Sequence, residues 1–300
     1  MFDANVALPP VLEGVTLNGQ MNVEDAAVLG NLASAVRRGW PQVWEQERKS
    51  DQVCLVGGGP SLTDTEDELR DLVWSGAKLV TMNGSYQWCI DHNLKPDAQI
   101  VLDARQGNAR FVSPAVTGCR YWIASQCHPD VFDACEGREY KAIWHSVNWD
   151  GPAKDLLDAY YLKQWKPIVG GTTVGLRSLS LLHMLGYVRF HLFGLDSCYL
   201  AGHGHAFVQA ENDGDKRAMA TVSPSNRPDL SRDFLVAGWH LKQLEDWLQF
   251  IRINGHLFLL NVHGDGLLAW ALQAAGDVTL TLDDAPNTLR TPLGGGSEGE

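Results

Sequence analysis

The chain has 300 residues, of which 45% are hydrophobic and 20% charged, and its formal net charge is −12. This length suits one large domain or two small ones, and the composition excludes a mainly disordered or coiled-coil chain. No apolar run reaches the roughly 18 residues that a membrane-spanning helix needs. The first residues also lack a basic segment followed by an apolar stretch. We therefore expect a soluble globular protein with no membrane span and no secretory signal.

The charge balance and the cysteines bear on partners and location. Acids number 36 against 24 bases, whereas a broad nucleic-acid face needs excess Lys and Arg to neutralise phosphates, so we expect no nucleic-acid partner. The six cysteines form no Cys-x-x-Cys pair, and several fall in apolar strand-like runs, as buried free thiols do. These features predict a reducing, cytoplasmic location, and the sequence leaves an oligomer possible.

The chain divides into three compositional zones: residues 1–50, 51–285 and 286–300. The first opens with a proline-bearing extended stretch, after which a helix is expected over Val23–Arg38 with Asn22 as its cap. The second has the composition of one folded domain. The third is rich in glycine and is expected to be a flexible tail.

The middle zone alternates strand-like and helical runs. The expected strands are Gln52–Val56, Lys78–Met82, Ala98–Leu102, Arg120–Ala124, Lys141–Trp144, Val188–Phe193 and His256–Val262. The expected helices include Asp64–Trp74, Thr173–Leu185 and Asp233–Ile253. Strands that alternate with helices of this length need parallel crossovers. The pattern predicts an α/β, Rossmann-like fold with a mainly parallel sheet and helices on both faces.

Three consecutive glycines follow the first expected strand. Gly57, Gly58 and Gly59 lead into Pro60 and Ser61, where a helix is expected to begin. Glycines let a backbone approach a ligand closely, and the N–H groups of a helix start favour phosphate, with Ser61 as a cap or an anion donor. The run is neither a Walker A loop nor a complete dinucleotide fingerprint. It is either a phosphate cradle, which we favour, or a plain tight turn.

Polar residues follow the next two expected strands. Asn83 and Ser85 come after the second strand and either hold a ligand over the sheet edge or cap a helix. Asp103 comes after the third strand, where a carboxylate can hold a ribose hydroxyl, bind a metal or cap the next helix. Ligands of open α/β sheets bind at the carboxyl ends of strands, so these residues are candidates for one site.

A second glycine-rich loop, Gly170–Gly175, precedes the helix that runs to Leu185. Gly171, Thr172 and Thr173 combine backbone freedom and hydroxyls at a helix N-terminus, which predicts a second anion site. Because crossovers of one hand bring alternate loops together, we expect this loop at the same sheet edge as Gly57–Ser61.

The segment after the strand Val188–Phe193 carries Asp196, Tyr199, His203 and His205. Two alternating histidines with an aspartate can form a metal site, and an imidazole can instead contact phosphate. We favour phosphate contact, and a purely structural role is the third interpretation.

These motifs resemble a known family. The runs VCLVGGGPSL, KPDAQIVLDA and GGTTVGLRSLSLLHMLGYVRFHLFGLDSCY, with Asn83 after the second strand, are similar to the MptE-like hydroxymethylpterin diphosphokinase domain. That family also contains the motility-associated (Maf) flagellin glycosyltransferases. More remotely, the layout resembles bacterial sialyltransferases of a GT-A-like type, whose single nucleotide-binding domain embraces a CMP-sugar.

The resemblance implies a nucleotide site made of matching residues: Gly57–Ser61, Asn83, Thr172–Gly175, Asp196 and Tyr199. It also places His205 where those sialyltransferases have a second phosphate-contacting tyrosine. Their histidine base, shortly before the late helix, has no counterpart in Arg232–Val236, and His240 is only nearby.

Three functions remain open. A glycosyltransferase would hold a nucleotide sugar, CMP-linked by resemblance, and stabilise the departing phosphate without a metal. A pyrophosphokinase would hold ATP and would need Mg²⁺ on Asp103 and Asp196. A non-catalytic accessory protein would keep only the nucleotide pocket. We favour the first, with His205, Asp103, Asp196 and His240 as catalytic candidates and an unknown acceptor. We also expect that a bulky side chain at Gly58 or Gly59 blocks phosphate without unfolding the domain.

Overall fold

The computed structural model describes residues 16–18, 23–146, 151–208, 215–224, 227, 229–273, 278–282 and 288–290. Its strands are β1 (Thr16–Asn18), β2 (Gln52–Val56), β3 (Lys78–Met82), β4 (Ala98–Val101), β5 (Arg120–Ala124), β6 (Lys141–Trp144), β7 (Arg189–Phe193), β8 (Arg217–Pro224), β9 (Arg232–Ala237), β10 (Leu259–Val262), β11 (Val278–Leu282) and β12 (Thr288–Arg290). Its α-helices are α1 (Asp25–Val36), α2 (Glu66–Trp74), α3 (Ser85–Asp91), α4 (Pro129–Ala134), α5 (Pro152–Tyr161), α6 (Val174–Met184), α7 (Gly238–Asn254) and α8 (Leu267–Gln273). Short 3₁₀ helices include η1 (Pro60–Leu62), η2 (Asn108–Val112) and η4 (Gly255–Leu257).

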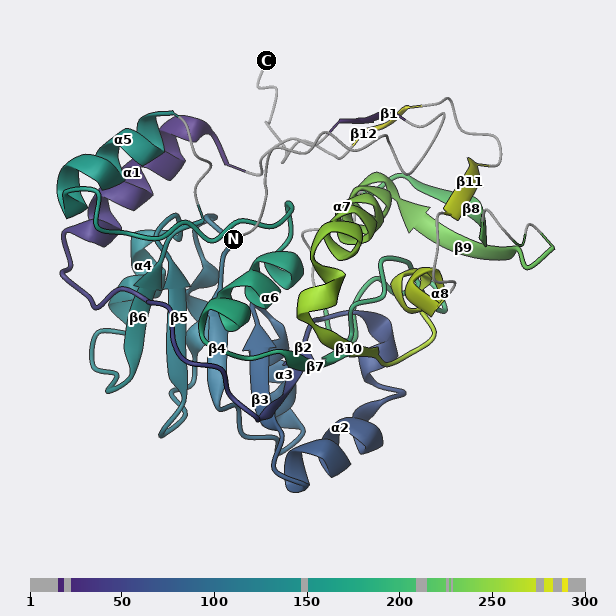
Figure 1. Ribbon diagram of the computed structural model, residues 1–300, viewed down its shortest axis with the longest axis horizontal. Helices are drawn as coiled ribbons and strands as arrows, with labels where there is room; N and C mark the ends of the chain where they lie inside the picture. The colour runs from purple at the N-terminus through teal and green to yellow at the C-terminus, as the bar shows by residue number, and fades with distance from the viewer. Residues whose placement is uncertain are drawn as a thin grey trace, which may run out of the picture.

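Seven strands form the central sheet in the order β10-β7-β2-β3-β4-β5-β6 (Figure 1). Every neighbouring pair is parallel. Strands β2 to β6 follow one another outward in one direction, and the chain then returns to place β7 on the other side of β2. The predicted α/β, Rossmann-like fold is confirmed.

Both faces of this sheet are covered, because its strands are apolar on both sides. Along β2, Val53 and Leu55 join the cluster that contains the apolar side chains of α6 and α7. Cys54 and Val56 alternate with them and join the cluster beneath α2 and α3. This alternation, with period two, is what a strand buried between two helical layers requires.

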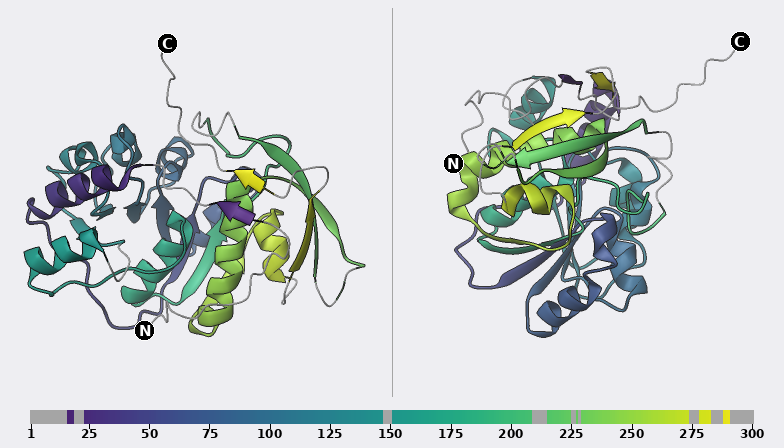
Figure 2. Two further views of the ribbon diagram at one scale, coloured as in Figure 1. Left: turned by 90° about the horizontal axis from the view of Figure 1, so that it is seen from above. Right: turned by 90° about the vertical axis from the view of Figure 1, so that its right-hand side faces the viewer.

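A second sheet, β11-β8-β9, is antiparallel and lies at one end of the molecule, beyond α7 (Figures 1 and 2). The sequence prediction missed it and assigned a helix to Asp233–Ile253. The first part of that range is strand β9, because Phe234 and Val236 alternate inward and join the main core with Ala220 and Val222 of β8. The helix therefore begins only at Gly238.

Other predicted boundaries also shift. The first helix spans Asp25–Val36, with Glu24 at its N-cap, and the expected cap Asn22 lies outside the described residues. The last sheet strand starts at Leu259, because His256 belongs to the 3₁₀ turn η4. Within the expected tail, β12 pairs in parallel with β1, and the rest of that tail is outside the described residues. The domain boundaries stay a prediction.

All six cysteines are free and buried. Burial raises the pKa of the Cys54 and Cys198 thiols to about 12 and that of Cys135 to about 11. Among the described helices, none has the length and apolar character to cross a membrane.

Candidate functional site

The site region is the carboxyl edge of β2 and β7, where the direction of strand addition reverses. In open α/β sheets this switch point is where ligands bind. A Cβ placed on Gly57, after β2, or on Gly175, at the start of α6, would lie 3.0 or 3.2 Å from the same Leu195 methyl group. The two glycine loops therefore lie at one edge, as the sequence predicted.

The first glycine loop packs backbone against backbone. Gly59 N–H donates to the carbonyl oxygen of Gly194 at 2.7 Å. A Cβ on Gly57 would lie 2.5 Å from that same oxygen, and a Cβ on Gly59 would lie 2.3 Å from Oδ2 of Asp196. Gly57 and Gly59 are thus required for the contact between the loops after β2 and β7. A bulky residue at Gly59 would disrupt this packing, so the expectation that it leaves the fold intact is wrong.

Asp196 is buried at the switch point, between the first glycine loop and the chain after β10. Its side chain accepts a hydrogen bond from Ser61 N–H, at the start of η1, at 2.8 Å. Gly266, after β10, approaches it so closely that a Cβ there would lie 2.6 Å from its Oδ1, and a Cβ on Gly264 would lie 2.3 Å from Ser61 Oγ. Burial raises the pKa of this carboxyl group, which is 3% exposed. The anion that the sequence predicts at Ser61 is, in this structure, the chain's own carboxylate.

The middle glycine, Gly58, faces a covering segment that we define as Gly202–Val208. Ala206 N–H donates to the Gly58 carbonyl at 3.0 Å. A Cβ on Gly58 would lie 2.7 Å from the Phe207 ring and 3.2 Å from the His205 ring. Phe207 also lies over Gly84, 2.8 Å from its Cβ position. These neighbours are side chains, which can shift when a ligand approaches.

Asn83, Ser85 and Asp103 all lie at this edge, and each bonds to the chain. Asn83 Oδ1 accepts from Leu102 N–H at 3.3 Å, and Ser85 Oγ donates to the Val56 carbonyl at 2.6 Å. Asp103 accepts from the Arg105 guanidinium through both carboxylate oxygens. The bonds of Asn83 and Ser85 connect the ends of β2, β3 and β4, so both residues have a structural role in this arrangement.

The second glycine loop is held by α7. Thr172 donates to Oδ2 of Asp246 from its backbone N–H at 2.9 Å and from its hydroxyl at 2.5 Å. Asp246 also pairs with Lys242 at 2.8 Å. Thr173 caps α6 by accepting from Leu176 N–H at 3.5 Å. The backbone N–H of Thr172, in this predicted anion site, is therefore also directed at a carboxylate of the chain.

Three predicted residues gather beside the covering segment. The rings of Tyr199 and His240 meet edge to face, with 4.8 Å between their centroids. The rings of His205 and Trp239 are nearly parallel, with 6.3 Å between their centroids. Asp215 accepts from Tyr199 Oη at 3.1 Å and from Trp239 Nε1 at 2.6 Å. The sequence analysis selected neither Asp215 nor Trp239 as a site residue, because neither stands in a motif.

His203, the other histidine predicted after β7, does not join Tyr199, His205 and His240. It is exposed, and its backbone pairs with Leu200 in a tight turn.

His240 is a neutral capping residue in this structure. Its Nδ1 accepts from Ala237 N–H at 2.9 Å at the start of α7, so the ring proton is on Nε2. Burial lowers its pKa to about 3, which keeps the imidazole neutral at pH 7. A general base works best with a pKa near the operating pH, and the buried His240 does not meet that condition.

A cavity of about 720 Å³ opens on the other side of Phe207. Its walls include Trp88, Phe111 and Gly84, and Arg110 and Asp91 also line it. This volume is in the range of small-molecule sites. Phe207 is therefore the wall between this cavity and the glycine loop.

The residues present do not make a preformed Mg²⁺ site. Asp103 is engaged by Arg105, and Asp196 by Ser61 N–H. Within the described ranges, no three His, Cys, Asp or Glu side chains are grouped so that they could hold a metal ion.

The comparisons with known proteins define the class. The family described as 6-hydroxymethylpterin diphosphokinase MptE-like matches residues 27–202, which is more than half of the chain. The chain belongs to this MptE-like family. A search of the curated proteins gave no match.

Among solved structures, the chain is similar to a Maf glycosyltransferase from Magnetospirillum magneticum AMB-1, with a TM-score of 0.53 and 12% identity. The similarity covers 87% of this chain and 42% of the other, so the chain spans less than half the length of that enzyme. At this identity the likeness shows the fold. The description of the family names a diphosphokinase, which is a transferase.

Proposed function

We propose that the chain is a group transferase that binds a nucleotide sugar at the β2/β7 switch point and transfers the sugar. The observation that carries the proposal is the position of Tyr199 and His205. Both lie on the chain after β7, and the His205 ring lies 3.2 Å from the Cβ position of Gly58. A phosphate laid on Gly58 would meet an imidazole there, with the Tyr199 hydroxyl in the adjoining group of rings.

In this proposal the chain's own residues stabilise the departing phosphate. Charge develops on the phosphate as the sugar leaves, and a positioned donor such as His205 lowers that barrier. Phe207 moves aside into the adjoining cavity as the donor binds, since its ring covers Gly58 and Gly84.

Donor hydrolysis tests the proposal, because it needs no acceptor. CMP-, UDP- and GDP-sugars are screened first by thermal shift, since a bound ligand raises the melting temperature. His205→Ala is expected to lower hydrolysis of the binding donor by roughly 10²-fold, the scale of one transition-state donor. His203→Ala is the matched control, because that exposed histidine lies outside the group. Equal rates in both variants would contradict the role of His205.

The family description favours one second candidate, a diphosphokinase that uses ATP and Mg²⁺. That reaction must neutralise the β- and γ-phosphates of ATP, so Asp103 would have to exchange Arg105 for the metal. Sugar transfer is expected to survive EDTA and Asp103→Asn. Activity on ATP that is lost under both treatments would reverse the ranking.

A further inference from the structure

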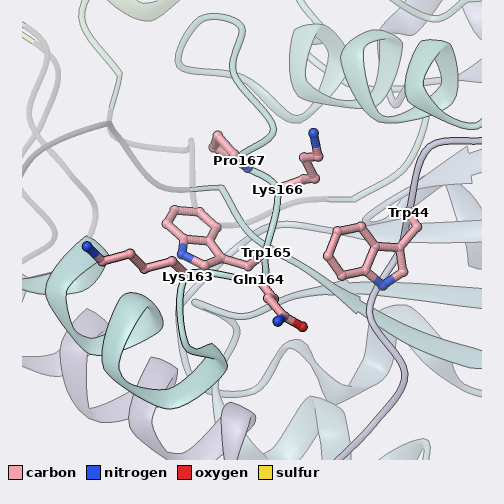
Figure 3. Close-up of a pocket in the computed structure, with 6 residues that line it drawn as sticks. All are labelled: Trp44, Lys163, Gln164, Trp165, Lys166 and Pro167. Carbon is pink, nitrogen blue, oxygen red and sulfur yellow. The ribbon is translucent and has the colours of Figure 1, made fainter.

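A second cavity, of about 420 Å³, lies far from the switch point and is lined by Trp44 and the segment Lys163–Pro167 (Figure 3). It adjoins the outer strand β6, four strands from β2, a separation of about 19 Å at the usual strand spacing. Its volume falls within the range of small-molecule sites. Neither the glycine loops nor the covering segment contributes to it.

The walls of this cavity are fixed before any ligand arrives. On one side Val43 N–H donates to the Ile143 carbonyl of β6 at 2.9 Å, which places Trp44. On the other side Ile168 N–H donates to the His145 carbonyl at 2.8 Å, which places Lys163–Pro167. Two segments distant in sequence are thus attached to the same strand end.

Gln42 joins the two walls directly. Its Nε2 donates to the Gln164 carbonyl at 3.2 Å, and its Oε1 lies 3.1 Å from Nε2 of the buried His145. Lys163 and the preceding Leu162 both have left-handed backbone, with φ of 63° and 51°. Consecutive non-glycine residues rarely adopt this conformation, and strained backbone concentrates at functional sites.

The chemistry of the lining is aromatic and cationic. The Trp44 side chain is 42% exposed, a large flat ring at the surface. Lys163 and Lys166 also line the cavity, and none of the lining residues is acidic, in a chain whose net charge is −12. Figure 3 shows Trp44 on one side of Gln164 and Lys163 on the other, with Lys166 above Gln164 in that view.

We propose that this cavity is a second binding site, for a nucleoside monophosphate. The base stacks on the exposed face of Trp44, as bases do on aromatic side chains in nucleotide-binding proteins. The phosphate lies against the Lys166 ammonium, and Lys163 adds attraction from the far end. The amide of Gln164 supplies a donor and an acceptor for the sugar or the base.

Calorimetric titration of AMP into the full-length Gly58→Val variant tests the site, because that variant blocks the glycine loop. One AMP is expected to bind. Trp44→Ala in this background is expected to weaken binding by about tenfold or more, the effect of losing one stacking partner. Trp44→Phe should retain most of the affinity. Trp74→Ala is the matched control, since Trp74 is 72% exposed on α2 and lines neither cavity.

Further titrations distinguish the contribution of the Lys166 charge to AMP binding from that of the Trp44 ring. Lys166→Gln is expected to weaken AMP several-fold and to flatten the salt dependence. Adenosine and ribose 5-phosphate, each carrying half of the chemistry, should both bind more weakly than AMP. Absence of AMP binding, unchanged affinity in Trp44→Ala and Lys166→Gln, or a preference for glucuronate over AMP would overturn the proposal.

The same titrations separate this site from the proposed function. A wild-type isotherm identical to that of Gly58→Val, still sensitive to Trp44→Ala, would assign AMP to this cavity alone. The proposed function fails independently of that result, if no CMP-, UDP- or GDP-sugar raises the melting temperature of the wild type. Loss of all AMP binding in Gly58→Val would place AMP at the glycine loop and would contradict a site in this cavity.

Discussion

The two glycine loops at the carboxyl edge have similar sequences, and an aspartate binds each of them in a different setting. Asp196 bonds to Ser61 in the first loop, where burial raises the pKa of its carboxyl group. Asp246 bonds to Thr172 in the second loop and pairs with Lys242. A glycine-rich helix start predicts backbone donors for an anion, but the chain itself can supply that anion. Within the first loop, Gly58 is bounded by the side chains of Phe207 and His205, whereas Gly57 and Gly59 meet the Gly194 backbone.

Substitution of a glycine in each loop is expected to give the largest difference in stability between the two loops. Gly59→Ala is expected to cost about 3 kcal/mol of unfolding free energy, because the new Cβ would meet Asp196 and the Gly194 backbone. Gly171→Ala should cost about 1–2 kcal/mol, because its φ of +61° is left-handed but the nearest atom is a movable Leu176 methyl group. Urea denaturation measures both. Equal losses would mean that the two loops are equally constrained.

Removing each aspartate is the next largest test. Asp196→Ala leaves the buried Ser61 N–H without its partner and is expected to cost about 2 kcal/mol. Asp246→Ala removes the acceptor of Thr172 N–H in a less buried setting and leaves Lys242 paired with Glu245, so it is expected to cost about 1 kcal/mol. Melting curves of the two variants, compared with wild type, check the order. A larger loss in Asp246→Ala would reverse the assignment of the more buried anchor.

Phe207→Ala tests whether the first loop is the accessible one. Its ring covers Gly58 and Gly84, so part of the free energy of donor binding is spent in displacing it. The variant is expected to bind the nucleotide found in the thermal-shift screen about threefold more tightly. Val208→Ala, at a side chain that is 99% exposed, should leave the affinity unchanged. Weaker binding in Phe207→Ala would instead make the ring a ligand contact.

The smallest expected effect is a pH dependence from Asp196. Burial raises its pKa in the folded chain above the unfolded value, so the folded state holds this proton more tightly. Its ionisation therefore reduces stability as pH rises from about 4 through the folded pKa. Asp196→Asn lacks this titration, so its stability relative to wild type should improve with rising pH. Urea denaturation between pH 4 and 7 measures the slope, and parallel curves would contradict it.

The sequence predicted the parts of the site that depend on local pattern. The strands β2 and β3 and the glycines after β2 stand at the predicted positions, because apolar runs bounded by glycine mark them. Leu195 shows that the second loop reaches the same edge, which parallel crossovers require. These inferences needed only the chain order and the properties of single segments.

The remainder depends on contacts between distant segments. Asp246 reaches Thr172 across 74 residues, and Asp215 joins Tyr199 to Trp239 without any motif. Strand β9 was read as helix because it continues directly into α7, and its pairing with β8 decides the matter. Such partners follow from tertiary packing, which a single sequence does not display.

The buried thiols give the molecule a set of internal reporters. A thiol reacts with alkylating agents as its thiolate, and burial suppresses both access and ionisation in the folded chain. Each cysteine therefore becomes reactive only when its surroundings open. Cys54 of β2 and Cys89 of α3 belong to the core cluster on the α2 and α3 side of the sheet, whereas Cys198 accepts from Leu267 N–H beside the switch point. The order in which these positions are labelled would reveal which layer of the sheet opens first.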